Sequence, residues 1–343
     1  MEEEFLLVDS KTSMTLLQQE KKQRFDTAIT RTTENLNDNH LPALPPRHHR
    51  DRPPHQSKNK KLTLPIQQQL LYNSTMQLTF KEHFVISFSG GIGSAASALL
   101  AFEHDLDFEC VFADTLIEDD DLHRFNADIE RVIGKAIIRL SVEMNPWEIF
   151  RKVKYIGNTR TAHCSQKLKT DVVRLYMAEN HPSSVLVLGM GRDEQERIER
   201  AKKMWSPIEV DSLLSAYGYS SHCMRTEIIE KYGVRLPRLY DMGFPHNNCG
   251  GFCVRAGQSQ FATLLARFPD RYQWHVEQEE ITYREIGPTA KPFLRKNIDG
   301  VTRYLRLSEF RDLVQSGSIT VDEFEFGGCA CFVDEVSTVS SSS

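Results

Sequence analysis

Apolar and polar positions alternate along the chain in a way that predicts strands followed by helices. Short apolar runs, of the kind that form buried strands, occur at 84–88, 107–113, 136–140 and 184–190. Segments with good helix formers or with apolar residues at helical spacing separate them, at 95–101, 119–134, 147–153 and 165–179. This alternation predicts an α/β fold, a doubly wound parallel sheet with right-handed crossovers. Helices predicted at 258–285 and 307–314 give it a mostly helical, cysteine-bearing C-terminal extension.

Composition divides the chain into four parts. Residues 1–78 are predicted to be a flexible extension, because 45–61 combines four prolines and many basic residues with little apolar content. That basic stretch suits a solvated linker or, as the alternative, an arm that binds nucleic-acid phosphates. The other parts are expected to be a phosphate-loop α/β domain, a cysteine-rich metal-site and helical region, and a disordered tail, at 79–245, 246–335 and 336–343.

Overall composition is that of an ordinary globular protein. The 343 residues are 40% hydrophobic and 26% charged, and the net charge of −5 provides no global basic field for nucleic acid. No apolar stretch reaches the length of a membrane span, and the acidic start of the chain does not resemble a secretory signal. We therefore expect a cytoplasmic protein without a membrane partner. In that compartment its seven cysteines are metal ligands, catalytic thiols or core residues rather than disulfides.

A glycine-rich turn follows the first predicted strand. Glycines let the backbone approach a ligand, and the first N–H groups and the dipole of the helix that follows favour a phosphate. No lysine lies in this turn, so it is not a Walker A loop. We expect Gly91 to adopt a positive φ, which would exclude a β-branched residue there. The predicted phosphate contacts are Ser89, Gly90, Gly91, Gly93 and Ser94. The alternative is that the glycines serve packing alone.

Two further predicted strands end in polar or glycine residues. The carboxyl ends of parallel strands share one edge of a sheet, and ligands bind there. Arg192 and Arg197 follow the fourth strand and can form bidentate bonds to phosphate or sulfate. The charged stretch around Arg197 also suits an ordinary surface helix, and Asp114 could serve only as a turn residue. The candidate contacts at these strand ends are Asp114, Thr115, Gly189 and Gly191.

Cys164 begins a predicted helix beside Arg160 and Lys167. A helix N-terminus and neighbouring cations lower the pKa of a thiol, and the thiolate is the form that attacks or binds metal. A buried structural cysteine usually lies inside an apolar run, which Cys164 does not.

Two cysteine pairs lie in glycine-framed turns near the end of the chain. They are Cys249 with Cys253 and Cys329 with Cys331. Close cysteine pairs in a reducing compartment are a metal-site pattern, although unrelated free thiols remain the alternative. Either zinc or a [4Fe–4S] cluster would accept four such thiolates. Cys110 and Cys223 are interpreted as core thiols.

The glycine turn resembles the Ser-Gly-Gly-x-x-Ser loop of the PP-loop superfamily, which includes ATP pyrophosphatases and phosphoadenosine-phosphosulfate (PAPS) reductases. Three further stretches resemble motifs of that group in the same order: Asp114-Thr115, the Cys-x-x-x-Leu-Lys segment 164–169, and Arg192 with Gln195 after the fourth strand. Tyr240-Asp241-Met242-Gly243 before a cysteine pair is similar to a segment of sulfonucleotide reductases. The resemblance covers roughly 84–253.

The resemblance implies an α/β enzyme of the adenine nucleotide alpha hydrolase-like group, whose substrate is ATP or a sulfonucleotide. It favours a [4Fe–4S] cluster over zinc, with Cys164, Cys249 and Cys253 as three ligands and Cys329 or Cys331 as the fourth. Similar cysteine sets occur in iron–sulfur sulfonucleotide reductases and in PP-loop subunits of DNA phosphorothioation systems. The implied catalytic residues are Arg192, Arg197 and Lys169.

The chain also departs from the family pattern. Ile92-Gly93 stands where ATP-cleaving members carry Lys-Asp, His163 replaces a second cysteine, and three residues rather than two separate Cys249 from Cys253. We expect a nucleotide-dependent transferase or oxidoreductase that transfers sulfur or adenylates an acceptor such as tRNA or DNA, with a sulfur-donor protein as a further partner. The alternative is a non-catalytic nucleotide sensor or nucleic-acid-associated protein with a structural zinc.

Overall fold

The computed structural model describes residues 83–158, 160–220, 223–298, 301–319 and 321, all within the unit Leu78–Ser343. The predictions for residues 1–78, for Cys329 and Cys331 and for the tail 336–343 lie outside the described residues.

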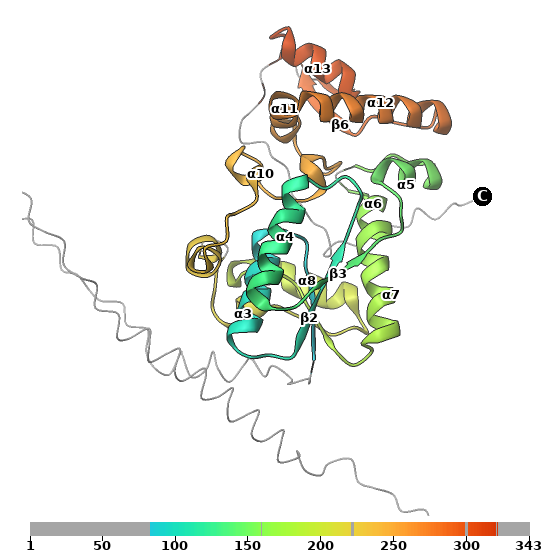
Figure 1. Ribbon diagram of the computed structural model, residues 1–343. Helices are drawn as coiled ribbons and strands as arrows, with labels where there is room; N and C mark the ends of the chain where they lie inside the picture. The colour runs from blue at the N-terminus through green and yellow to red at the C-terminus, as the bar shows by residue number, and fades with distance from the viewer. Residues whose placement is uncertain (1–82, 159, 221–222, 299–300, 320, 322–343) are drawn as a thin grey trace, which may run out of the picture. The chain divides into compact units, whose positions relative to one another are not determined.

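A five-stranded parallel sheet forms the centre of the described unit (Figure 1). Its strand order is β3-β2-β1-β4-β5, so the chain leaves β1 toward one side of the sheet and returns to the other side at β4. The strands are β1 (Phe84–Ser87), β2 (Phe108–Ala113), β3 (Ile137–Leu140), β4 (Val185–Val187) and β5 (Val210–Asp211). The predicted fold class is confirmed. The sequence patterns did not identify β5, which is only two residues long.

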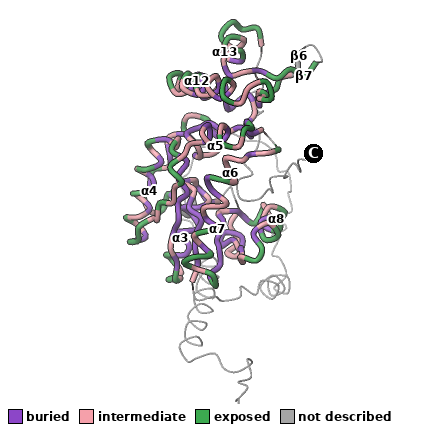
Figure 2. The backbone as a smooth tube through the Cα atoms, turned by 90° about the vertical axis from the view of Figure 1, so that its right-hand side faces the viewer, coloured by how far each residue is buried: buried purple, intermediate pink, exposed green. Residues whose placement is uncertain are grey.

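Helices cover both faces of the sheet because successive strand residues point to opposite sides. Phe84 and Ile86 of β1 pack with α3 (Ile92–Glu103) and α4 (Asp120–Ile133), whereas Val85 packs with α7 (Asp171–Asn180) and α8 (Gln195–Trp205). Helix α3 is buried along almost its whole length, which explains its run of alanine, serine and leucine. Figure 2 shows buried residues gathered around α3.

A second hydrophobic core is separate from the sheet. It combines residues of α5 (Pro146–Val153) with residues from the C-terminal part of the unit. Trp147 and Phe150 of α5 pack there with Phe252, Phe261 and Tyr272. The C-terminal helical region is present. The elements of this part are α10 (Arg238–Asp241), α11 (Gln258–Arg267), α12 (Pro269–Ile286), α13 (Leu307–Gln315), and a hairpin of β6 (Leu294–Ile298) and β7 (Val301–Leu305).

Two predicted helices are divided in the structure. The segment 258–285 forms two helices because Pro269 cannot continue α11 and instead occupies the first turn of α12. The segment 165–179 begins as α6 (His163–Ser165), passes through the π-helical segment η1 (Gln166–Thr170) and continues as α7. The short remaining elements are η2 (Arg192–Glu194), α9 (Leu213–Ala216), η3 (Met224–Ile229), η4 (Glu230–Tyr232) and η5 (Cys249–Gly251). Among the helices that the structure describes, none has the length and apolar character needed to span a bilayer.

Candidate nucleotide and cysteine site

The loop between β1 and α3 is held in shape by its own serines. The Ser94 hydroxyl accepts a hydrogen bond from the Ser89 N–H (3.1 Å) and donates one to the Gly91 carbonyl (3.0 Å). Gly90 has a φ of +73°, whereas Gly91 is extended with a φ of −94°. The expectation of a positive φ at Gly91 is therefore wrong, and Gly90 makes the left-handed turn instead. A side chain at Gly90 would also collide with Leu122, at 2.7 Å.

Gly93 and Gly189 bring the loops after β1 and β4 into direct contact. A Cβ atom on Gly93 would lie 2.3 Å from the Gly189 carbonyl oxygen, and one on Gly189 would lie 2.4 Å from the Ser94 nitrogen. Both distances are far below van der Waals contact, so no larger residue fits without backbone movement. The two strand ends share one edge of the sheet because β1 and β4 are neighbours.

The segment that precedes the cysteine pair covers this loop. The Ile92 N–H, at the start of α3, donates to the Tyr240 hydroxyl (3.3 Å), and the Arg225 guanidinium lies over the Tyr240 ring at 5.0 Å. The fully buried Asn247 donates from its side-chain nitrogen to the Gly90 carbonyl (2.9 Å). The phosphate-type loop and the cysteine-bearing part of the chain are thus in contact.

Asp114 and Thr115 at the end of β2 are engaged in contacts within the protein. One Asp114 carboxylate oxygen accepts from Arg139 Nε (2.8 Å) and the other from the Leu116 N–H (2.8 Å). The Thr115 hydroxyl donates to Glu118 (2.8 Å). A nucleotide contact by either side chain stays a prediction.

Glu118 joins this strand end to the cysteine loop and to Lys169. Its carboxylate accepts from the Cys249 N–H as well as from Thr115, and the Lys169 ammonium lies 3.6 Å from the Cys249 sulfur. Burial raises the pKa of Glu118, whereas the Lys169 charge and the two hydrogen bonds act in the opposite direction. Lys169 is only 4% exposed. A buried ammonium beside a sulfur stabilises the thiolate, so Cys249 is electrostatically suited to hold a metal.

The segments that bear Cys164 and the Cys249–Cys253 pair lie against each other. The Arg255 guanidinium donates to the Arg160 carbonyl (3.2 Å), and a Cβ on Gly157 would lie 3.1 Å from a Val254 methyl carbon. Cys164 and Cys253 pack against the same second core. Together with the Lys169–Cys249 contact, these approaches place the three described candidate ligands on two adjacent segments.

The Cys249-Gly250-Gly251 turn is conformationally demanding and strongly anchored. All three residues have positive φ values, of 54°, 57° and 89°. Its carbonyls accept from Arg271 (2.7 Å, at Gly250) and Gln260 (2.7 Å, at Gly251). A Cβ on Gly250 would lie 2.3 Å from the Ile117 carbonyl oxygen. Glycine is therefore required for the turn to pack against the segment that connects β2 to α4.

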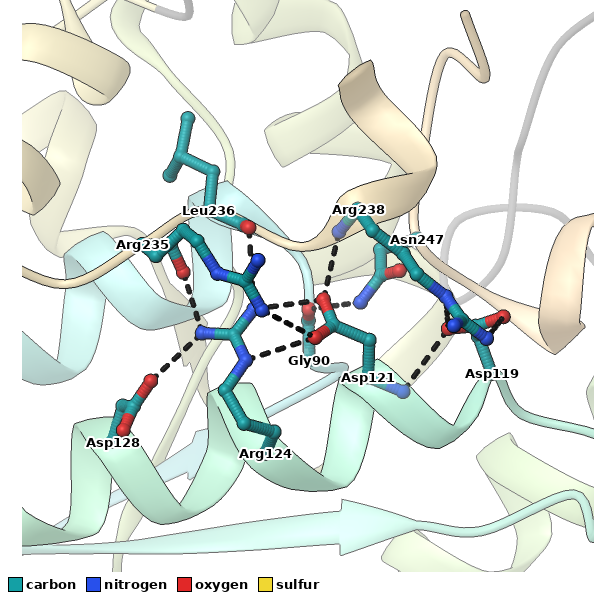
Figure 3. Close-up of polar contacts among 9 residues, drawn as sticks. All are labelled: Gly90, Asp119, Asp121, Arg124, Asp128, Arg235, Leu236, Arg238 and Asn247. Atoms are coloured by element: carbon teal, nitrogen blue, oxygen red, sulfur yellow. Dashed lines mark hydrogen bonds and ion pairs between the residues drawn. The ribbon is translucent and has the colours of Figure 1, made fainter. Parts of the chain in front are cut away.

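Asp119, which is 0% exposed, holds the side chains of two arginines in place. Arg238 binds both of its carboxylate oxygens (2.7 and 2.9 Å), and Arg271 binds one of them (2.9 Å). Burial alone would raise the pKa of Asp119, but the hydrogen bonds from Arg238, Arg271 and the Asp121 N–H outweigh it and lower that pKa. Figure 3 shows Arg238 reaching Asp119 beside a second cluster, in which Arg124 bridges Asp121, Asp128 and the backbone carbonyls of 235–236.

The two arginines after β4 have different environments. Arg192 has an exposed side chain for which the described residues show no ion pair, and its N–H donates to the Tyr219 carbonyl (2.8 Å). Arg197 is half-buried and forms an ion pair with Glu194, which also accepts from the Gly191 N–H (2.9 Å). Of these two arginines, Arg192 is therefore the more exposed and Arg197 the one held by an ion pair.

Several residues of this site escaped sequence reasoning. Glu118 and Asp119 belong to an acidic run that indicates only the start of a helix, and Arg271 lies in a plain charged helix. The run 118–121 was the available signal, since four consecutive acidic residues beside a strand end require cationic partners.

Comparisons with known proteins found similarity over part of this chain. Residues 83–216 match the family model described as the phosphoadenosine phosphosulfate reductase domain. The chain is 29% identical over 228 residues to an uncharacterised protein of Methanocaldococcus jannaschii, covering 64% of this chain and 45% of that one. It thus spans less than half the length of that curated relative. A crystal structure of phosphoadenylyl-sulfate (PAPS) reductase from Candida auris, in complex with phosphate, is similar with a TM-score of 0.35 and 10% identity, over 51% of this chain and 84% of that one.

The family match spans all five strands of the sheet and includes the phosphate-type loop, the Cys164 segment and Arg192. Residues 83–216 of this chain are therefore similar to the phosphoadenosine phosphosulfate reductase domain.

Proposed function

We propose that this protein is an enzyme that binds ATP or a sulfonucleotide at the loop Ser89–Ser94 and uses a cysteine-ligated [4Fe–4S] cluster beside it in sulfur transfer or acceptor adenylation. The observation that carries this proposal is the Lys169–Cys249 contact, at 3.6 Å. It links the cysteine segments, through Glu118 and Thr115, to the end of β2 beside the loop.

The loop supplies the phosphate-binding part. The backbone N–H groups at the start of α3 concentrate partial positive charge there. Gly90 and Gly93 have no side chain, so the loop can pack closely against Leu122 and Gly189. Arg192, exposed at the same edge, would stabilise negative charge that develops on a leaving pyrophosphate or sulfite. Arg197 is engaged by Glu194, so we assign it a supporting role in holding the Gly191 turn.

The cysteine segments supply the metal-binding part. Cys164, Cys249 and Cys253 offer soft thiolate ligands, which suit both iron–sulfur clusters and zinc. Family resemblance favours the cluster, with Cys329 or Cys331 as the fourth ligand. When bound, such a cluster supplies redox or electrostatic chemistry close to the nucleotide. Lys169 would offset the negative charge of the thiolates, and Asp119 and Arg271 would hold the Cys249 turn in its ligating conformation.

One observation favours a sensor with a structural zinc as the second candidate. The loop carries no cationic side chain, because Ile92-Gly93 replaces Lys-Asp and Gly93 packs tightly on Gly189. A protein that only binds nucleotide does not need a residue that stabilises the leaving group.

A product assay separates the two candidates. Anaerobically purified full-length protein is incubated with ATP and, in turn, with tRNA, DNA or a sulfide donor, and released pyrophosphate is measured. Parallel reactions with a sulfonucleotide and a thiol reductant measure sulfite. We expect product in one of these reactions. Tight nucleotide binding without product in any of them would contradict the enzyme proposal and support the sensor.

A further inference from the structure

A cluster of two histidines and a glutamate lies at the amino-terminal ends of β1 and β2, whereas the phosphate-type loop follows the carboxyl end of β1. His83 directly precedes β1, Glu109 lies near the start of β2, and His181 follows α7. Val85 and Glu109 are paired in the parallel register, so they point to the same face, and His83 shares that face because it is two residues from Val85. This is the face that α7 covers, which explains how His181 reaches the other two.

The three side chains already have the spacing of ligands around one ion. One donor atom from each of His83, Glu109 and His181 lies within 4.8 Å of the other two. His181 Nε2 lies 2.8 Å from a Glu109 carboxylate oxygen, and the two imidazole rings stack with centroids 4.6 Å apart. All three side chains are half-buried, so a solvent ion can reach them while their positions are constrained.

Neighbouring groups orient two of the three ligands from behind. Nδ1 of His83 is 3.1 Å from the Ser184 hydroxyl, which leaves Nε2 directed elsewhere. The Tyr176 hydroxyl donates to the Glu109 carboxylate (2.6 Å). Metal-binding histidines and carboxylates commonly have such outer partners, which fix ring orientation and tautomer.

We propose that His83, Glu109 and His181 form a binding site for one divalent transition-metal ion of the zinc type, separate from the cysteine site. Two imidazoles and one carboxylate are a common ligand set for such ions, with the remaining positions filled by water. The ion would replace the direct His181–Glu109 contact and connect β2 to the residues that precede β1 and follow α7. The ion would stabilise the packing of α7 against the amino-terminal ends of β1 and β2. This metal site does not depend on the proposed nucleotide function.

Cobalt(II) is the probe that distinguishes this site from the cysteines. Thiolate ligation gives Co²⁺ an intense charge-transfer absorption in the near ultraviolet, whereas a histidine and carboxylate site shows only weak visible bands. We expect full-length protein, with its cysteines occupied by their native metal, to bind about one further equivalent of Co²⁺ with visible bands and no new thiolate absorption. Zinc should displace it.

Substitutions assign that signal to the residues. His83→Ala and His181→Ala should each weaken Co²⁺ binding by at least about tenfold, and Ser184→Ala, which removes only an outer partner, by about tenfold. His123→Ala is the matched control, because His123 is exposed on α4 away from the cluster, and it should bind Co²⁺ as the wild type does. Circular dichroism verifies that each variant is folded. Two results would overturn the proposal. One is that every Co²⁺ ion that binds produces thiolate absorption. The other is that the folded Ser184→Ala and His181→Ala variants bind Co²⁺ as tightly as the wild type.

Discussion

The phosphate-type loop is bonded to Asn247, which shortly precedes the cysteine turn, yet the loop and the turn are built in different ways. The shape of the loop is set by hydrogen bonds between residues at most five positions apart, from Ser89 to Ser94, and the distant Tyr240 and Asn247 add one hydrogen bond each. The cysteine turn is fixed by partners far away in the chain, such as Lys169, 80 positions from Cys249, and Asp119, 152 positions from Arg271. The loop can therefore take its shape from neighbouring residues, whereas the cysteine turn needs distant segments of the chain to come together.

The largest expected effect is loss of metal from the cysteine turn. Cys249→Ser and Cys253→Ser keep the size of the side chain but replace a soft thiolate, so each should remove most of the bound metal. Cys223→Ser is the control, because the Cys223 sulfur accepts a hydrogen bond from Ser220 and lies outside the proposed ligand set. Metal content per folded chain is the measurement. Full retention in both ligand variants would show that the turn is not a metal site.

The second effect concerns the edge with the two arginines. Arg192→Ala should lower turnover by about a hundredfold or more, the range found when one donor to developing charge is removed, with a smaller change in nucleotide affinity. Arg197→Ala should lower turnover much less, because Arg197 is held by Glu194. Steady-state kinetics of the two variants give the comparison. Equal losses in both variants would contradict the different roles assigned to them.

The third effect separates packing from binding within the loop. Gly93→Ala places a Cβ against the Gly189 carbonyl and should destabilise the fold by about 1–3 kcal/mol as well as weaken nucleotide binding. In Gly91→Ala the new Cβ lies 3.4 Å from the Tyr240 hydroxyl, an ordinary contact, so stability should change by less than about 0.5 kcal/mol. Denaturant unfolding and calorimetric nucleotide titration test both variants. Similar destabilisation in the two would refute the packing role of Gly93.

The smallest effect is a pH dependence at Glu279, where α12 meets the start of α13. Burial, reinforced by Glu280, raises the pKa of Glu279 to about 8, although the Leu307 N–H and Arg306 act against it. Glu279 is thus protonated in the folded protein at pH 6–7 and ionised in the unfolded chain. Unfolding then releases a proton, so stability falls as pH rises from about 4.5 toward 8.

Glu279→Gln should remove that dependence. For the wild type, raising the pH from 6 to 7 should cost up to about 1.4 kcal/mol of unfolding free energy through this group, and the variant should lack that loss. Paired urea titrations at the two pH values measure the difference. If the unfolding free energy of the wild type and of the variant changed equally between pH 6 and pH 7, Glu279 would be ionised in the folded protein.

The same contrast explains what could be predicted from the sequence. Strands β1 to β4 and the loop Ser89–Ser94 follow from apolar runs and a glycine turn, both of which are local. Glu118, Asp119 and Arg271 owe their positions to partners more than a hundred residues away, and their local sequence indicates only ordinary helices. The hairpin β6–β7 and the short strand β5 were missed for a related reason, since neither has an apolar run that marks a strand on its own. Gly91 shows the limit in detail, because sequence could not tell which glycine makes the left-handed turn.

Iron and acid-labile sulfide in protein purified without oxygen test the proposed pairing of nucleotide loop and cluster most directly. A [4Fe–4S] cluster held by the cysteine segments predicts brown protein with about four iron and four sulfide per chain. It also predicts that both quantities fall together in Cys249→Ser. Colourless protein without iron or sulfide would contradict the cluster. One zinc per chain that is lost in Cys249→Ser would then leave a structural metal at the cysteine turn.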